Sequence, residues 1–117
     1  MNSLKTERTR VKRIPERGHY DKQTIYSIID EAIYCHVGIN HNDSPVVIPT
    51  IHARKDDTLF IHGSAASRLL KSVQSENNMC VTITLLDGIV LARSAFHHSL
   101  NYRSVVIFGN GKIVEDA

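Results

Sequence analysis

Residues 59–68, with the sequence LFIHGSAASR, combine side chains and a local order of elements that could hold a phosphate group. A predicted strand runs into a Gly/Ser turn at Gly63 and Ser64, and a short helix then begins near Ser67 and Arg68. A helix N-terminus offers free N–H groups and a positive dipole end, to which two hydroxyls and a guanidinium add donors. The alternative is an ordinary helix cap at Ser67 beside a solvated Arg68, because the segment matches neither a P-loop nor GxGxxG.

A second polar segment, residues 93–103 (RSAFHHSLNYR), supplies two arginines, two histidines, two serines, an asparagine and a tyrosine. Loops that carry such groups often recognise a ligand, although many polar loops bind nothing. The pair His97 and His98 does not indicate a metal site, because adjacent strand residues point to opposite faces. The other histidines form no HExxH or comparable spacing, so we predict no bound zinc.

A third candidate is residues 46–54, VVIPTIHAR, where Pro49 interrupts a predicted strand. A proline there favours a bulge or an unpaired edge whose backbone groups could face a planar ligand. It could equally be an edge-strand proline that prevents aggregation. The serines lack a Gly-x-Ser-x-Gly elbow and no carboxylate pair stands in an apolar motif. If the protein is an enzyme, a cofactor must therefore supply the reactive atom.

The elements that position these segments follow from periodicity. Asp21 is the expected N-cap of a helix over residues 22–33. Apolar side chains lie along one face of that helix: Ile25, Ile28, Ile29, Ala32 and Ile33. Three short strands then follow, with turns at residues 41–44 and 55–57.

The second half of the sequence predicts a short helix over residues 68–73 and a strand over residues 79–85. Asp87 and Gly88 indicate a hairpin turn after that strand. A polar loop over residues 93–101, a last strand over residues 105–108 and a bulge at residues 109–111 complete the pattern. Short strands joined by tight turns predict a mainly β (α+β) antiparallel barrel with an N-terminal docking helix and a short inserted helix.

Composition limits the chain to one ordinary globular domain: 117 residues, 42% apolar and 22% charged. Residues 1–17 carry six basic and two acidic side chains, although the whole chain has a formal net charge of +2. We therefore divide it into a basic N-terminal arm, residues 1–20, and a domain over residues 21–117. The arm could contact an anionic cofactor or be a solvated terminus, and nucleic acid is not the expected partner.

The cysteines, Cys35 and Cys80, have neither a CxxC partner nor zinc spacing, and each lies in an apolar run. Free thiols of this kind usually behave as small buried hydrophobes. Together with the lack of a secretory h-region, they favour a cytoplasmic protein. No apolar stretch approaches the roughly 20 residues that a membrane-spanning helix needs.

Four segments together resemble a known family: CHVGIN, VVIPTIHAR, LFIHGSAASRLL and CVTITLLDGIVLARSAFHHSLNYRSVVIFG. They are similar to the flavin-nucleotide-binding proteins related to pyridoxamine 5′-phosphate oxidase, in the branch that includes nitroimidazole-resistance reductases. The similarity begins near Lys12 and extends to the C-terminus. It implies an FMN-binding split β-barrel that forms a homodimer, with two FMN molecules in clefts between the subunits.

The resemblance also implies which residues bind FMN. The strand over Val47, Ile48, Pro49 and Thr50 would offer backbone contacts to the isoalloxazine ring. The phosphate and ribityl chain would lie at the turn formed by His62, Gly63, Ser64, Ser67 and Arg68, in agreement with the anion-site chemistry above. Asn101, Tyr102 and Arg103 would lie near the flavin of the other subunit. His97 and His98 fall near the ring without an assigned role.

Members of this family usually continue through a further helical segment and at least one more strand, so we expect residues 21–117 to lack the family's C-terminal segment. The expected function is that of an FMN-dependent oxidoreductase acting on a small molecule. The alternatives are a non-catalytic flavin-binding or storage protein and a haem-binding split barrel.

Overall fold

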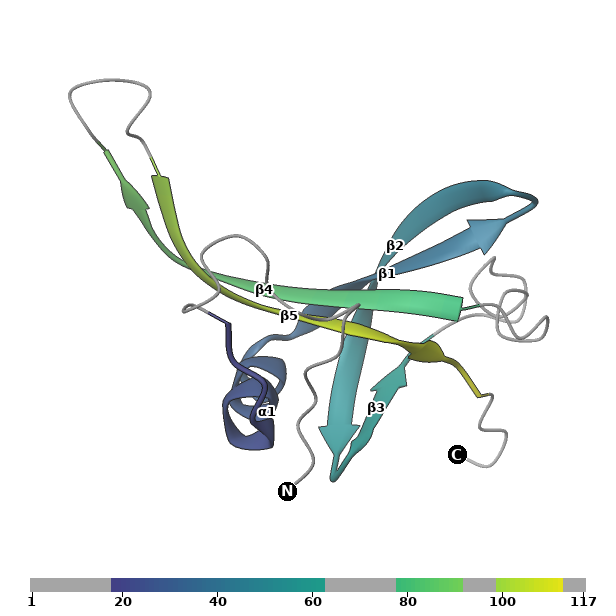
Figure 1. The fold of residues 1–117 in the computed structure, drawn as a ribbon, viewed down its shortest axis with the longest axis horizontal. Coiled ribbons are helices and arrows are strands. Elements are labelled where there is room, and N and C mark those ends of the chain that lie inside the picture. Colours follow the sequence, from purple (N-terminus) through teal and green to yellow (C-terminus); the bar gives the residue numbers. More distant parts are fainter. Residues whose placement is uncertain (1–17, 63–77, 92–98, 113–117) are drawn as a thin grey trace.

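The computed structural model describes residues 18–62, 78–91 and 99–112, which form one helix and five strands (Figure 1). The elements follow the order α1 (Lys22–Glu31), β1 (Tyr34–His41), β2 (Ser44–Lys55), β3 (Thr58–Ile61), β4 (Asn78–Val90) and β5 (Ser99–Asn110). The strands form a sheet of order β3-β2-β1-β4-β5 in which every described pair is antiparallel. The predicted antiparallel β fold with an N-terminal helix is thus confirmed. The basic arm, the predicted helix over residues 68–73 and the loop residues 93–98 lie outside the described residues.

Helix α1 begins as the sequence predicts, with Asp21 as its N-cap. The Asp21 carboxylate accepts hydrogen bonds from the backbone N–H of Thr24 (2.9 Å) and from its hydroxyl (2.7 Å). The helix ends at Glu31 because Ala32 is extended, with ψ 147°. The prediction that Ile33 belongs to the buried face is therefore wrong: its side chain is 76% exposed, whereas Ile28 is 7% exposed.

Both predicted hairpin turns before β3 are confirmed. Asn42 and Asp43 take left-handed φ values of 53° and 61° between paired His41 and Ser44, as a two-residue type I′ turn requires. Asp56 has φ 52° in the corresponding turn between β2 and β3. A bulge at Pro49 is not formed, because Pro49 lies opposite His36 in an unbroken β1–β2 register.

The predicted hairpin turn at Asp87 and Gly88 is wrong. Strand β4 continues through both residues, and a β-bulge between Leu86 and Gly88 absorbs the extra residue. Gly88 has no positive φ, which a type I′ turn would demand. Pairing with β5 extends on both sides of the bulge and outweighs the local turn preference. As a result, residues 99–101 are strand rather than loop, and Gly109 and Asn110 pair in regular register instead of forming a bulge.

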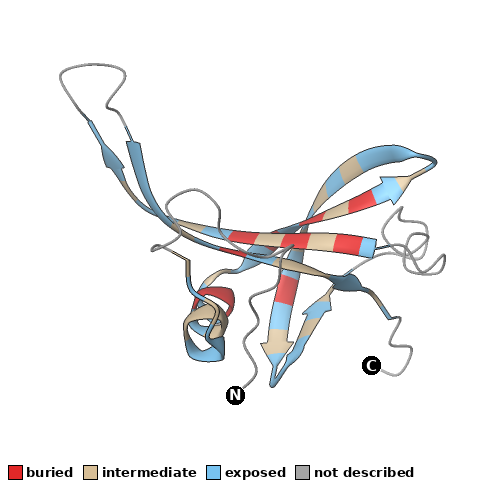
Figure 2. Cartoon of the chain, in the orientation of Figure 1, coloured by how far each residue is buried: buried red, intermediate tan, exposed pale blue. Residues whose placement is uncertain are grey.

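The core lies on the face of the sheet against which α1 packs (Figure 2). Alternation along β1 places Cys35, Val37 and Ile39 on this face, each at most 4% exposed. Strands β4 and β5 complete it with Met79, Val81, Ile83 and Val105, and α1 contributes Ile28 and Ile29. We call this the inner face of the sheet, and the opposite one the outer face.

Candidate functional site

The outer face exposes apolar side chains where a water-facing sheet would carry polar ones. Alternation and register assign to it the side chains that lie opposite to the core on each strand. The exposed apolar members run across all five strands: Tyr34, Val47, Ile51, Phe60, Leu86, Ile89, Leu100, Tyr102 and Val106. An apolar surface of this extent usually marks a binding or association site.

His36 adds an imidazole to the outer face. It lies on β1, exposed, and its ring meets that of Tyr34 edge-on with 5.8 Å between centroids. Its neighbours across the sheet are Pro49 on β2 and Thr82 on β4. Gly38 follows on the same face, so the surface beside His36 has no side chain at that position.

The backbone edge of β2 is the part of this surface that could bind a planar polar ligand. Strand β3 pairs with β2 only from His52 onward. Because Pro49 has no N–H, its pair with His36 must be a non-hydrogen-bonded one, and the residues alternating with it direct their backbone groups away from β1. These include Pro45 and Val47. Between the two prolines, the edge therefore offers carbonyl acceptors and the single N–H of Val47.

The residues predicted to contact the flavin ring divide between the two faces. Val47 is 65% exposed on the outer face, and exposed Pro49 lies two residues along it. Ile48 and Thr50 are half-buried on the inner face, where Ile48 packs against the core. The Thr50 hydroxyl donates to the carbonyl oxygen of His62 (2.8 Å), which ties the end of β3 to β2. The remaining predicted phosphate residues, Gly63, Ser64, Ser67 and Arg68, lie outside the described residues.

The predicted residues on β5 lie far from those on β2. Register connects Pro49 through β1 and β4 to Val106, which is four residues from Tyr102. Three strand spacings of about 4.8 Å and four residues of about 3.4 Å place Tyr102 roughly 20 Å from Pro49. The β1–β2 and β4–β5 hairpins also leave their shared centre in different directions (Figure 1). The structure therefore does not bring residues 47–50 and 101–103 of one chain together.

Arg103 faces the inner side of the sheet, whereas its neighbour Tyr102 is 61% exposed on the outer side. Its guanidinium makes two forked ion pairs. Nη1 and Nη2 donate to the Glu31 carboxylate (2.7 and 3.2 Å), and Nε and Nη2 donate to the Asp87 carboxylate (2.9 and 2.8 Å). Hydrogen bonds from Arg103 lower the pKa of both carboxyl groups, and hydrogen bonds to Asp87 and Glu31 raise the pKa of Arg103.

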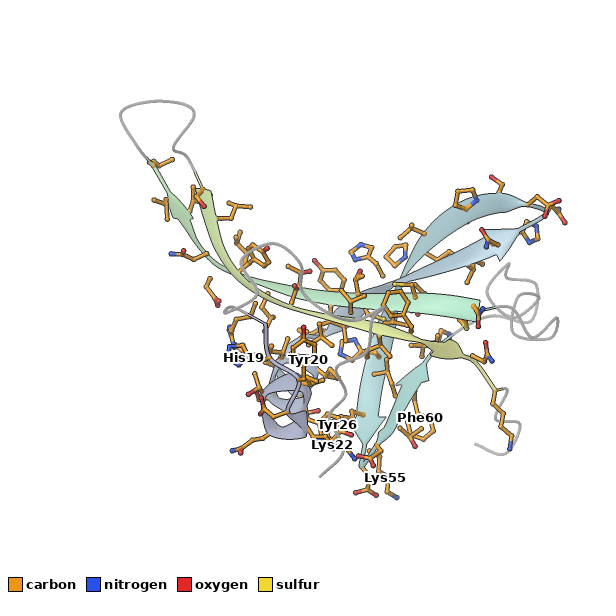
Figure 3. The ribbon with its side chains drawn as sticks, viewed as in Figure 1. His19, Tyr20, Lys22, Tyr26, Lys55 and Phe60 are labelled. Carbon is orange, nitrogen blue, oxygen red and sulfur yellow. The ribbon has the colours of Figure 1, made fainter. Side chains whose placement is uncertain are left out.

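A second polar network fastens α1 to the β2–β3 hairpin. Arg54 on β2 donates to the Asp30 carboxylate through Nε (2.8 Å) and Nη2 (2.7 Å), which lowers the pKa of Asp30. The same guanidinium lies 4.3 Å from the ring centroid of Tyr26. The Tyr26 hydroxyl donates to Asp57 and raises the pKa of the tyrosine, and Lys22 pairs with the same carboxylate (3.0 Å). Figure 3 shows Tyr26 and Lys22 on α1 near the hairpin end that carries Lys55.

His52 is buried beneath the helix, 9% exposed. Its Nε2 lies 2.8 Å from the carbonyl oxygen of Ile29, so an Nε2–H donates to the helix, while Nδ1 has no partner. The sequence analysis assigned no role to His52, Arg54, Asp30, Asp57 or Glu31. Their partners are 23 to 72 residues apart along the chain, and no short-range pattern could have connected them.

Two further searches concern the described part of the chain alone. No three His, Cys, Asp or Glu side chains gather closely enough there to hold a metal ion. None of its helices has the length and hydropathy that crossing a bilayer would need.

Residues 21–117 match the pyridoxamine 5′-phosphate oxidase family. The chain belongs to this family. The family match covers α1 and all five strands, which are the elements that build both faces of the sheet. Comparison with curated proteins gave no significant match.

Three solved structures resemble the chain in sequence and fold. The flavocytochrome Anf3 from Azotobacter vinelandii is 40% identical with a TM-score of 0.86, over 95% of this chain and 51% of that protein. An FAD- and haem-binding protein from Mycobacterium smegmatis is 33% identical with a TM-score of 0.72, over 77% and 44%. A protein assigned to 5-nitroimidazole antibiotic resistance from Bacteroides thetaiotaomicron is 33% identical with a TM-score of 0.66, over 82% and 57%.

These likenesses confirm the predicted family and the split-barrel fold. The chain spans about half the length of the solved relatives.

Proposed function

We propose that this chain binds a flavin nucleotide, FMN, on the outer face of its sheet, in a cleft between two copies of the chain. The observation that carries the proposal is the apolar outer face next to the open β2 edge. A flavin ring needs a flat apolar surface together with a few backbone donors and acceptors at its polar rim. Val47 and Pro49 supply the surface, and the Val47 N–H and the flanking carbonyl groups supply the polar contacts.

The rest of the cofactor is proposed to follow β3 toward its phosphate site. His62 ends that strand, and the chain continues into Gly63, Ser64, Ser67 and Arg68. The backbone N–H groups and the hydroxyls would orient the phosphate, and the guanidinium would neutralise its charge. This arrangement distinguishes FMN from riboflavin, which has no phosphate.

The proposed homodimer follows from the separation on the sheet. Residues 47–50 and 101–103 are both proposed to line a flavin site, yet they lie roughly 20 Å apart in one chain by strand spacing and rise. They can serve one ring if residues 101–103 come from the second copy. Association would also cover exposed apolar side chains such as Ile51 and Leu100.

The proposed activity is that of a flavin-dependent oxidoreductase acting on a small molecule. A bound flavin supplies hydride and single-electron chemistry, and the chain's own residues bind it, orient it and exclude water. A flavin-binding or storage protein is the alternative, and turnover of NAD(P)H with oxygen or a nitro compound separates the two. We place the protein in the cytoplasm, where Cys35 and Cys80 would remain the free thiols that they are in the structure.

Haem is a second candidate ligand, because two of the similar structures are named for haem or cytochrome as well as flavin. His36 has an exposed imidazole on the apolar outer face, where it could ligate an iron. The absorption spectrum and mass of the co-purifying chromophore separate FMN, FAD and haem. A Soret band that His36→Ala removes would favour haem.

A titration with FMN tests the ring site. Val47→Asp places a charge where the ring should lie and is expected to weaken binding at least about 30-fold. Thr58→Asp is the matched control, because it adds the same charge at an exposed position of β3 and should bind like the wild type. Equal FMN affinity in both variants would contradict the outer-face site.

The phosphate site has its own test. Arg68→Ala should lower FMN affinity roughly 30–150-fold and leave riboflavin affinity nearly unchanged. An unchanged preference for FMN over riboflavin would place the phosphate elsewhere. Sedimentation with FMN bound tests the dimer, and a monomer at micromolar concentration would rule out the shared cleft.

A further inference from the structure

The β4–β5 hairpin extends beyond the bulge at Asp87 as a two-stranded ribbon. We call this part, residues 87–90 and 99–102, the arm. Strand β1 pairs with β4 only at Cys80, Val81 and Thr82, so no third strand of the described chain supports the arm, which projects from the body in Figure 1. A lone two-stranded hairpin is marginally stable in water. Something at its base must therefore fix its direction.

Arg103 lies at that base, opposite Leu85 and just before the bulge. One fork of its guanidinium binds Asp87, the bulged residue, and the other binds Glu31, the last residue of α1. A planar guanidinium that is forked on both sides fixes the relative orientation of its two partners, which a lysine ammonium cannot do. These three residues, which we call the latch, connect the helix, the bulge and the arm.

The bulge gives the latch its geometry. An extra residue in one strand redirects its side chain and bends the strand. Here it brings the Asp87 carboxylate to the Arg103 guanidinium, with 2.8 Å between Oδ1 and Nη2. The same alternation sends Tyr102 and Leu100 to the outer face. The orientation of the arm therefore decides where these two side chains are presented.

We propose that Glu31 and Asp87 are positioning residues: through Arg103 they hold the arm in the direction that presents Leu100 and Tyr102 to the flavin site of the second copy. This inference rests on the proposed flavin-binding function, and it gives Arg103 a role on the inner face rather than a contact with the flavin. All but one of the guanidinium hydrogens already point at a carboxylate oxygen.

Hydrogen exchange of the arm amides tests the latch without any flavin. Glu31→Gln and Asp87→Asn each remove one fork and should speed exchange in residues 99–102 about fivefold or more, because the arm opens locally. Asp30→Asn is the matched control: it neutralises the neighbouring carboxylate of the same helix, which pairs with Arg54 rather than with the latch. Unchanged arm exchange in both latch variants would overturn the proposal.

FMN affinity then separates positioning from direct contact. If the latch positions the arm, Glu31→Gln weakens FMN binding about tenfold, and Arg103→Lys, which keeps the charge without the fork, weakens it as well. If Arg103 instead contacts the flavin, Glu31→Gln frees its guanidinium and binding stays equal or becomes tighter, which overturns the proposal. A wild-type protein that binds no flavin would refute the proposed function, whereas the exchange experiment would still decide whether the latch orders the arm.

Discussion

Replacing Ile28 and Ile33 separately by alanine tests the packing of α1 with one chemical change at two positions. Both are isoleucines, and helical periodicity alone places both on the same face. In the structure Ile28 is 7% exposed within the core, and Ile33 is 76% exposed beyond the end of the helix. The same loss of side-chain atoms should therefore have very different effects on stability.

Ile28→Ala removes buried methyl and methylene groups and leaves a cavity between α1 and the sheet. Such substitutions reduce the free energy of unfolding by about 2–4 kcal/mol. In a domain of this size that corresponds to a melting temperature lower by roughly 10–25 °C. Alanine's higher helix propensity offsets at most about 0.5 kcal/mol of the loss. Ile33→Ala removes no buried contact and should change stability by less than about 0.5 kcal/mol.

Urea unfolding followed by circular dichroism measures both free energies, with the slope against urea concentration as a check on two-state behaviour. Protein free of flavin at low concentration keeps ligand binding and association out of the comparison. Equal destabilisation by the two variants would contradict the assigned end of α1 at Glu31. An unchanged free energy in Ile28→Ala would contradict the packing of α1 on the inner face.

Three further outcomes are expected. The pKa values of Asp30 and Asp57 are lowered in the fold by their hydrogen-bonded partners; their contribution is therefore full above about pH 4 and lost as pH falls through the lower folded values, so a double Asn variant should show a shallower fall in melting temperature from about pH 5 to pH 3. Equal slopes would disprove this. Cys35 is fully buried, and burial raises its pKa, so a thiol reagent should label half-buried Cys80 first in the native protein; faster labelling of Cys35 would contradict the core. Asp43→Gly should raise stability by about 0.5 kcal/mol because φ at this position is 61°, and a lower melting temperature would count against the type I′ turn.

The candidate site shows how far sequence reasoning extends. The apolar alternation of β2 and the Gly/Ser segment after β3 indicated a ring site and a phosphate site, because each depends on residues close together in the chain. Which face each residue occupies required the register. Val47 and Tyr102 lie on the outer face, whereas Arg103 lies on the inner one. A one-residue difference in a strand reverses the face, and no local pattern fixes the pairing of β1 with β4.

The sequence by itself determined the features whose energies are local. The Asp21 cap, the turn at Asn42 and Asp43, and the alternation of β1 each depend on a few consecutive residues, and each forms as predicted. Tertiary structure decided the rest, because long-range contacts outweigh local preferences of a kcal/mol or less. It turned Asp87 and Gly88 from a hairpin turn into a bulge, because β4 gains more from continued pairing with β5. It also joined Arg103 to Glu31 across 72 residues, a contact that exists only after the helix and the sheet have packed together.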